Sequence, residues 1–312
     1  HYSPLTTHHS LLTSKCASMK KHICYFSCLC AITLLASACK DKPEAIPAYL
    51  QLEPFAVNAQ GGAAGQKITD GWLYVNGEFL GAYTLPATVP ILADGESEVW
   101  VFPGVKKNGL VETPDIYSMM KRHDRDYNLT PGQTTVIQPI TDYDANTVYA
   151  WDLNRGSFDG GTVLLLEARD DDPVTNFALT SDGAFGGVGR SVSMKVDTAH
   201  ALIEIAAEQV PLPTAGAQET WLEIHYRNDV PFELWLLGTR GLSTQELSQA
   251  VYYFNTSDNW NKTYFNLTEF VVAMQQDKYR LFFRVALPKD AAGKYTQTEG
   301  TVRLDNIRLL HF

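Results

Sequence analysis

Cysteine is scarce in this 312-residue chain, and its distribution excludes several kinds of chemistry. Four of the five cysteines lie before residue 31 and the fifth is Cys39, so residues 40–312 contain none. That long segment can therefore hold no disulfide framework, no catalytic thiol and no cysteine-ligated zinc. Its stability has to come from a packed hydrophobic core.

Catalytic motifs and positive charge are also lacking. The sequence has no G-x-S-x-G elbow, no H-E-x-x-H pair, no phosphate-binding loop and no E-x-D-x-x-E pattern of the kind found in one jelly-roll glycosidase family. The net charge is −10, which disfavours nucleic acid and anionic lipid as partners. We therefore expect a protein that is not an enzyme and that needs no cofactor.

The N-terminal segment has the layout of an exported protein. Residues 1–18 are interpreted as over-extended translation, and residues 19–38 as a signal peptide with a basic start. The apolar run from Ile23 to Ala36 is too short to span a membrane. Cleavage after residue 38 would also remove three lysines, which takes the net charge from −10 to −13.

The residues at that cleavage point carry a first resemblance. Leu35-Ala36-Ser37-Ala38-Cys39 resembles the lipobox of bacterial lipoproteins, which implies that Cys39 is lipidated and becomes the new N-terminus. Residues 39–48 would then form a lipidated tether. The charged stretch after Cys39 fits a solvated tether, and it also resembles the export signal of Bacteroidetes surface lipoproteins. The resemblance implies an outer-membrane protein anchored by lipid, on the periplasmic or the cell-surface face.

Residues 49–142 show a β pattern throughout. Asn76-Gly77 between Trp72–Val75 and Glu78–Tyr83 predicts a tight hairpin, because both turn residues tolerate positive φ. The pattern between residues 104 and 129 is irregular. The stretch from Ile68 to Pro139 resembles the PEGA-type small β-sandwich of bacterial surface proteins, which implies a spacer or recognition unit.

Residues 147–312 contain more of the apolar residues, and their pattern predicts many short strands separated by turn residues. This pattern is typical of a sandwich or jelly roll. Helices are expected only at 243–249 and near 268–275. We therefore predict an all-β protein, with an N-terminal small β-sandwich followed by a C-terminal β-jelly roll. The strands are expected at Val163–Ala168, Ser191–Val196, Leu202–Ala207, Trp221–Arg227, Phe232–Leu237, Val251–Phe254, Lys262–Leu267, Tyr279–Leu287 and Thr301–Leu309.

Two segments of this second domain carry another resemblance. Asn259–Leu267 and Gly300–Leu309 are similar to strands of galactose-binding-like jelly rolls and carbohydrate-binding modules. The resemblance implies a glycan or polysaccharide as partner. Asp305 occupies the place where related modules sometimes hold a structural calcium, so it is a candidate metal ligand.

Period-two alternation in three strands predicts the candidate binding residues. One face of 221–227 would carry Trp, Glu, His and Arg, and Trp235 would share a face with Glu233. If these strands are neighbours, one sheet face offers an aromatic ring for stacking and charged groups for sugar hydroxyls. A solvated face with ion pairs Glu223–Arg227 or Glu233–Arg284 explains the same pattern. The candidate ligand-binding residues are Trp221, Glu223, His225, Arg227, Trp235, Arg280 and Arg284.

Three functions are compatible with these features. The first is a non-catalytic envelope lipoprotein that binds carbohydrate through its jelly roll. The second is a structural accessory subunit that docks on an outer-membrane protein complex through the first domain. The third is a glycoside hydrolase, which would require two carboxylates within about 5–10 Å of each other in a cleft.

Overall fold

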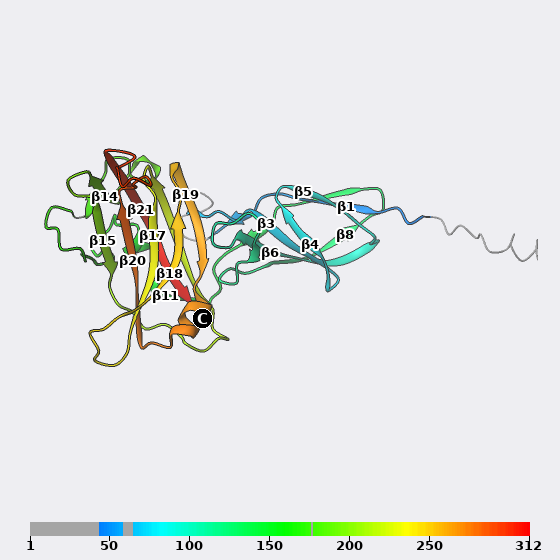
Figure 1. The fold of residues 1–312 in the computed structure, drawn as a ribbon. Helices are drawn as coiled ribbons and strands as arrows, with labels where there is room; N and C mark the ends of the chain where they lie inside the picture. Colours follow the sequence, from blue (N-terminus) through cyan, green and yellow to red (C-terminus); the bar gives the residue numbers. More distant parts are fainter. Residues whose placement is uncertain (1–43, 59–64, 176) are drawn as a thin grey trace, which may run out of the picture. The chain divides into compact units, whose positions relative to one another are not determined.

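The computed structural model describes residues 44–58, 65–175 and 177–312. The contacts divide the chain into two units, His1–Ile46 and Pro47–Phe312, and the second contains all the strands described below. The predicted signal peptide and the lipidation site Cys39 lie outside the described residues. The all-β fold class is confirmed, and the chain folds as a small β-sandwich followed by a β-jelly roll (Figure 1).

The first sandwich consists of two main sheets. Their inward-facing side chains, among them Leu50, Leu73 and Val101, share one core because alternate residues of each strand point inwards. A small pair, β2 (Ala56–Val57) with β10 (Ile140–Thr141), adjoins them. The three-stranded sheet has the order β5 (Ala87–Ile91), β1 (Ala48–Leu52), β9 (Thr134–Ile137), and the other sheet the order β4 (Glu78–Thr84), β3 (Asp70–Val75), β6 (Gly95–Lys106), β7 (Pro114–Ile116), with β8 (His123–Leu129) also on β6.

The predicted hairpin is confirmed. β3 and β4 pair antiparallel around Asn76 and Gly77, whose φ angles are 51° and 80°. The segment with an irregular pattern, residues 104–129, nevertheless contains β8. Its register against β6 places Leu129 opposite Gly95, and Leu129 is completely buried. A mostly polar edge strand can therefore pair with the sheet when one of its apolar side chains enters the core.

The jelly roll packs a six-stranded sheet against a five-stranded sheet. Their inner faces share the largest core of the protein, in which Phe232, Phe254, Phe265 and Phe283 are almost completely buried. The six-stranded sheet has the order β13 (Phe177–Thr180), β14 (Ser191–Asp197), β21 (Glu299–His311), β16 (Thr220–Asn228), β19 (Ser257–Asn266), with β11 (Val148–Trp151) on β21. The five-stranded sheet has the order β12 (Leu166–Ala168), β15 (Leu202–Ala207), β20 (Lys278–Ala286), β17 (Phe232–Thr239), β18 (Leu247–Phe254).

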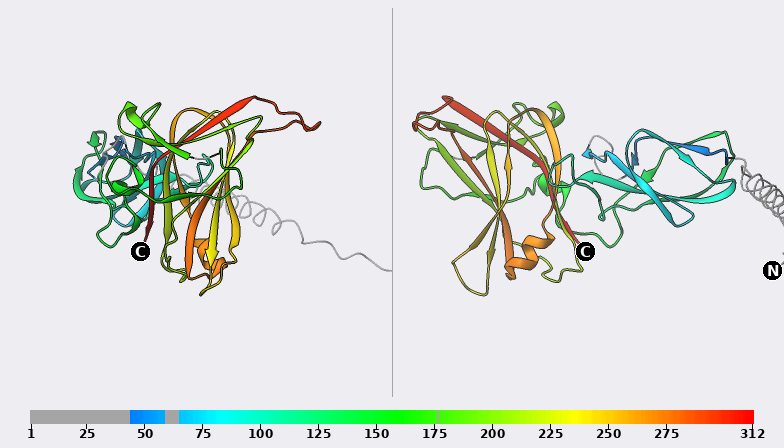
Figure 2. Two further views of the ribbon diagram at one scale, coloured as in Figure 1. Left: turned by 90° about the vertical axis from the view of Figure 1, so that its left-hand side faces the viewer. Right: turned by 45° about the vertical axis from the view of Figure 1, so that its right-hand side comes forward.

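Each strand predicted for this domain is present: β15 has the predicted ends, and the others differ at one or both ends. β11 and β13 were not predicted. The helix expected at 268–275 is α3 (Thr268–Met274), which closes one end of the sandwich (Figure 2). The prediction of a helix at 243–249 is wrong, because β18 begins at Leu247 and pairs with β17. The described part of the chain also contains a short helical turn, α2 (Leu153–Gly156), and a 3-10 turn, η2 (Phe185–Gly187). Among the described residues, no helix has the length and apolar character needed to cross a membrane.

Candidate functional site

The strands that carry the predicted binding residues belong to two different sheets. β16, with Trp221 to Arg227, lies between β21 and β19 in the six-stranded sheet. β17 and β20, with Trp235, Arg280 and Arg284, pair with each other in the five-stranded sheet. The outer faces of two stacked sheets point in opposite directions. The expectation that one face displays all seven residues is therefore wrong.

Trp221, Glu223 and His225 lie inside the protein, with exposed fractions of 1%, 0% and 3%. Trp221 packs edge-on against Tyr117 of the first sandwich, and its indole N–H donates to Glu219 at 2.6 Å. Residues preceding the jelly roll cover this part of the six-stranded sheet. An aromatic ring covered in this way cannot stack on a sugar, so the exposed placement predicted for these three residues is wrong.

Glu223 is the centre of a buried polar network. Its Oε1 accepts hydrogen bonds from the hydroxyls of Tyr117 at 2.5 Å and Tyr143 at 2.6 Å. Its Oε2 accepts from Lys262 Nζ at 2.5 Å and lies 3.7 Å from Arg308 Nη1. Tyr117 and Tyr143 precede the jelly roll, whereas Lys262 and Arg308 belong to it. The network therefore joins the two parts of the unit.

One carboxylate between two cations explains the electrostatics of this network. Burial alone would raise the pKa of Glu223, but the attraction of Lys262 and Arg308 outweighs it and lowers that pKa to about 2. Burial lowers the pKa of Lys262 to about 8 despite the attraction of Glu223, and repulsion by the Arg308 cation adds to the lowering. For His225, burial and the charge of Lys262 lower the pKa to about 3, so its imidazole is neutral at pH 7.

Arg227 and Asp305 lie elsewhere on the six-stranded sheet. Arg227 is half-buried and lines a small polar recess of about 200 Å³ together with Asp229 and Asp258. The ion pair Glu223–Arg227 considered from the sequence does not form, because Glu223 pairs with Lys262 instead.

Asp305 is 4% exposed, accepts a hydrogen bond from the Ser191 hydroxyl and accepts another from the backbone N–H of Asn306 at 2.7 Å. Burial raises the pKa of Asp305 to about 7. No group of three or more His, Cys, Asp or Glu side chains suited to a metal occurs among residues 44–58, 65–175 and 177–312. Calcium binding by Asp305 stays a prediction.

The remaining predicted residues lie on the outer face of the five-stranded sheet. Trp235 is half-buried there, Arg280 is largely covered, and the Arg284 side chain is 40% exposed. The register aligns a row of side chains across four adjacent strands, namely Glu204, Arg284, Glu233 and Tyr253. Trp235 and Phe282 form the next row. This face therefore combines rings and charged groups, but without Trp221, Glu223, His225 and Arg227, which lie on the other sheet.

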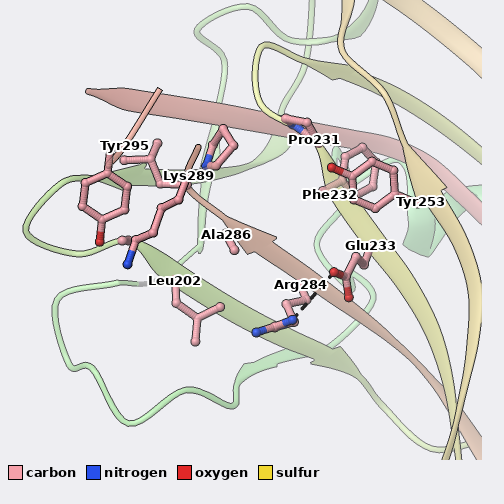
Figure 3. A pocket seen from close by; sticks show the side chains of 12 residues that line it. Leu202, Pro231, Phe232, Glu233, Tyr253, Arg284, Ala286, Lys289 and Tyr295 are labelled. Carbon is pink, nitrogen blue, oxygen red and sulfur yellow. Dashed lines mark ion pairs between the residues drawn. The ribbon is translucent and has the colours of Figure 1, made fainter. Parts of the chain in front are cut away.

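An open groove of about 550 Å³ lies over one end of this face. In Figure 3, Tyr295 and Lys289 lie at one end of the groove, and Tyr253 and Glu233 lie at the other, with Arg284 below. Tyr253 is 57% exposed. The lining residues are Ala201, Leu202, Pro231, Phe232, Glu233, Tyr253, Arg284, Ala286, Leu287, Pro288, Lys289 and Tyr295.

Ion pairs hold the polar side chains of the groove in place. Arg284 lies between Glu204, at 3.1 Å, and Glu233, at 3.6 Å, so the Glu233–Arg284 ion pair considered from the sequence does form. The other carboxylate oxygen of Glu233 accepts the indole N–H of Trp235 at 2.7 Å. Lys289 Nζ lies 4.7 Å from the centre of the Tyr295 ring. The groove thus presents donors, acceptors and two tyrosine rings, and ion pairs hold Arg284 and Glu233 in place.

Arg280, farther along the same face, belongs to a second charged cluster. Its guanidinium pairs with Glu246 and also with Glu167, at 2.5 Å. Arg169 bonds the other oxygen of Glu246 at 2.9 Å. Arg280 therefore supports the sheet face beside the groove and does not line it.

The groove residues that were not predicted as ligand contacts include Glu233, Tyr253, Lys289 and Tyr295, and Glu204, which pairs with Arg284, was not predicted either. Glu204 and Tyr253 occupy outward positions of strands that were expected, so alternation along 202–207 and 251–254 could have indicated them. Lys289 and Tyr295 lie after β20 in a connecting segment, where no periodicity marks them.

No protein-family model matches this chain, and no curated protein matches it by sequence. The resemblances to lipoproteins and to PEGA-type sandwiches therefore stay predictions. Among solved structures, the enzymatically active domain of tailspike protein 4 from bacteriophage CBA120 matches with 11% identity and a TM-score of 0.39, over 57% of this chain. This chain spans 25% of that domain's length.

Carbohydrate-binding modules are also found among the solved structures. Modules of the β-sandwich superfamily match at 13% identity and a TM-score of 0.35, over 78% of this chain and 85% of theirs. The family 11 module of the Clostridium thermocellum cellulase Lic26A-Cel5E matches at 10% identity and a TM-score of 0.33, over 48% of this chain and 90% of the module. The all-β class rests on the strands of the chain itself.

Proposed function

We propose that this protein binds carbohydrate in the groove on the outer face of the five-stranded sheet. One observation supports the proposal above all: the exposed ring of Tyr253 continues the row formed by Glu204, Arg284 and Glu233. An aromatic ring can stack on the apolar C–H face of a sugar, while guanidinium and carboxylate groups bond its hydroxyls. Both kinds of contact are available within one groove.

The size and rigidity of the groove support the same proposal. Its volume of about 550 Å³ falls within the range of about 300–1,000 Å³ that is usual for small-molecule sites. The pairs Arg284–Glu204 and Arg284–Glu233 fix the polar groups before a ligand arrives. A ligand then binds without having to order these side chains, which favours affinity.

We propose binding rather than catalysis at this groove. A glycosidase places two carboxyl groups on opposite sides of the scissile bond, one to donate a proton and one to act as nucleophile or base. Here Glu204 and Glu233 flank the same Arg284 guanidinium. That arrangement fits a recognition site, in which the carboxylates accept hydrogen bonds from sugar hydroxyls.

We further propose that the protein is held at the outer membrane by a lipid on Cys39, with the jelly roll as its binding unit. The support is the apolar run that ends in the lipobox-like residues 35–39. Metabolic labelling with an alkyne fatty acid tests this directly. The natural protein should be labelled and sediment with membranes, whereas Cys39→Ala should abolish both; an unlabelled natural protein would contradict anchoring.

Binding is tested with the purified unit Pro47–Phe312. We would screen it on a glycan array and by affinity electrophoresis in gels that contain soluble polysaccharides. The groove variants are Tyr253→Ala and Arg284→Gln, and the matched control is Tyr149→Ala, which removes a 40% exposed tyrosine ring outside the groove.

The expected result is retention of the natural protein by at least one polysaccharide and a clear loss of affinity in both groove variants. Loss of one stacked ring should weaken binding about 2- to 12-fold, from the 0.5–1.5 kcal/mol typical of aromatic contacts. The control should bind like the natural protein. Equal retention of all four proteins would show that the groove is not the site.

A further inference from the structure

The outer face of the β4-β3-β6 sheet in the first sandwich carries a continuous set of aromatic rings. Trp72 lies opposite Phe102, and Tyr74 lies opposite both Trp100 and Phe79 in the strand register. The neighbouring rings are in contact, with centroid distances of 5.0 Å for Tyr74–Phe79 and 5.5 Å for Trp72–Phe79. We call these five rings the aromatic face.

The aromatic face is turned away from the core of its own sandwich. The residues that alternate with the rings, Leu73, Val75, Val99 and Val101, are the ones that fill that core. The rings themselves are half-buried, and Phe79 on the edge strand β4 is 46% exposed. The sheet β5-β1-β9 packs against the opposite, inner face of the β4-β3-β6 sheet. The rings therefore form an outward surface rather than a second core.

The exposed parts of the two indoles are carbon. The indole Nε1 atoms of Trp72 and Trp100 are covered and have no hydrogen-bond acceptor among the described residues. Each indole thus hides its polar edge and offers its ring carbons to the outside. Such a surface is suited to stacking contacts and poorly suited to hydrogen bonding through the rings.

The charges around the aromatic face are mainly negative. Glu96, Glu98, Asp124 and Asp126 are exposed and occupy outward positions of β6 and β8. The guanidinium carbon of Arg122 lies over the Trp100 ring, 3.9 Å from its centre, and the guanidinium is bonded to Asp124 at 2.8 Å. The cation next to the rings is thus already paired with a carboxylate. An anionic ligand, such as a nucleic acid or a sulfated or uronic-acid glycan, would meet repulsion here.

We propose that the aromatic face is a second carbohydrate-binding site, and that it takes a neutral polysaccharide chain. The rings supply stacking surface for C–H faces, and the surrounding carboxylates accept hydrogen bonds from hydroxyl groups. A neutral sugar matches both properties. The site uses none of the groove residues of the jelly roll, so this proposal can be tested independently of the groove.

A protein partner fits these observations less well. Interface cores are depleted in Asp and Glu, whereas four carboxylates border these rings. The face also lacks exposed aliphatic side chains: among the large exposed hydrophobic residues, it contains only Phe79. A cationic peptide could meet the negative charge, and the test below includes one as a competing occupant.

The test uses the Pro47–Phe312 unit with the groove variant Tyr253→Ala as background. Affinity electrophoresis is run in gels that contain hydroxyethylcellulose, xyloglucan, galactomannan or, as an anionic probe, alginate. Phe79→Ala and Trp72→Ala test the aromatic face, and Tyr149→Ala is the matched aromatic control. Circular dichroism checks that each variant is folded; Phe79→Ala on an exposed edge strand is expected to fold normally.

If the proposal holds, at least one neutral polysaccharide retards the Tyr253→Ala protein, alginate does not, and each face variant weakens retention about 2- to 12-fold. Retention that Phe79→Ala and Trp72→Ala leave unchanged overturns the proposal. Retention by alginate alone, or no retention in any gel, also overturns the proposal. So does a lysine-rich peptide whose binding Phe79→Ala abolishes, when no glycan retards the protein. Failure of the groove proposal is recognised separately: the Tyr253→Ala variant is then retained as strongly as the natural protein.

Discussion

Replacing Glu223 by Gln removes the negative charge from a buried cluster that also contains two cations. Gln has nearly the same shape as Glu and can still accept hydrogen bonds from Tyr117 and Tyr143. Lys262 and Arg308, with side chains 3% exposed, lose the negative charge of Glu223 and remain buried. The variant therefore tests the charge of the network separately from its size.

Two estimates of the loss agree. Breaking a buried ion pair by removing one partner typically costs about 3–5 kcal/mol, because the other charge is left uncompensated. The fall of the Glu223 pKa from 4.5 to about 2 corresponds to roughly 3 kcal/mol, at about 1.4 kcal/mol per unit. We expect the free energy of unfolding to fall by roughly 3–5 kcal/mol, a large part of the stability of an ordinary domain.

Urea unfolding of the Pro47–Phe312 unit at pH 7, followed by circular dichroism, measures this loss. The control is Asp115→Asn, which breaks the Lys107–Asp115 pair, where both side chains are 36% exposed. An exposed pair contributes less than about 1 kcal/mol. If Glu223→Gln destabilises the protein no more than Asp115→Asn does, the network does not stabilise the fold in the way inferred here.

Acid gives a second readout of the same carboxylate. Because the pKa of Glu223 is lower in the folded protein than in the unfolded chain, its contribution is complete above about pH 4.5 and is lost as the pH falls towards 2. The natural protein should lose stability across that window. Glu223→Gln should show a shallower dependence there.

Three further predictions concern other parts of the jelly roll. Burial raises the pKa of Asp305 to about 7, so the folded protein retains a proton that the unfolded chain releases near pH 4. Stability should therefore fall as the pH rises from about 4 to 7, and Asp305→Asn should remove that fall in a series of thermal midpoints. Gly156→Ala would place a Cβ 1.8 Å from the carbonyl oxygen of Ile307; we expect a loss of about 1–3 kcal/mol or more, measured by urea unfolding, and an unchanged midpoint would contradict this close packing. The Asp172 carboxylate, 2.6 Å from His200 Nδ1, raises the pKa of His200; Asp172→Asn should return that pKa towards 6.5 in an NMR titration, and an unaltered curve would rule out the pair.

The sequence was sufficient to predict the strands of the jelly roll, because their apolar residues alternate or run continuously between turn residues. It was also sufficient for the β3-β4 hairpin, since Asn76-Gly77 has a local steric reason to turn. It failed at 243–249, where a helix-compatible composition was overridden by pairing of β18 with β17. β11 and β13 are four residues each, too short for a periodic signal.

The candidate site was predicted in part, for a reason visible in β16. Its alternation of Trp221, Glu223 and His225 with apolar residues marks two faces but does not reveal what covers each face. A polar face can be solvated, or it can be buried against complementary groups such as Lys262 and Tyr117. Only the tertiary arrangement distinguishes these cases, and here it buries the face.

The aromatic face illustrates the opposite situation. The pairs Trp72 with Tyr74 and Trp100 with Phe102 are visible in the sequence as period-two repeats beside the core residues Leu73 and Val101. Large aromatic residues in a strand usually indicate core, so these repeats by themselves do not predict a binding surface. The register shows that they share the outward face, and that placement could not be read from either strand alone.

The most direct test of carbohydrate binding in the groove is an NMR titration that follows the tryptophan indole N–H signals of the Pro47–Phe312 unit. The titrant is an oligosaccharide of a polysaccharide that retains the protein. The Trp235 N–H donates to Glu233 at the groove, whereas the Trp221 N–H donates to Glu219 at a buried position. We predict that the Trp235 signal shifts with saturation while the Trp221 signal stays in place. A saturable shift elsewhere that leaves Trp235 unchanged would contradict the proposed site.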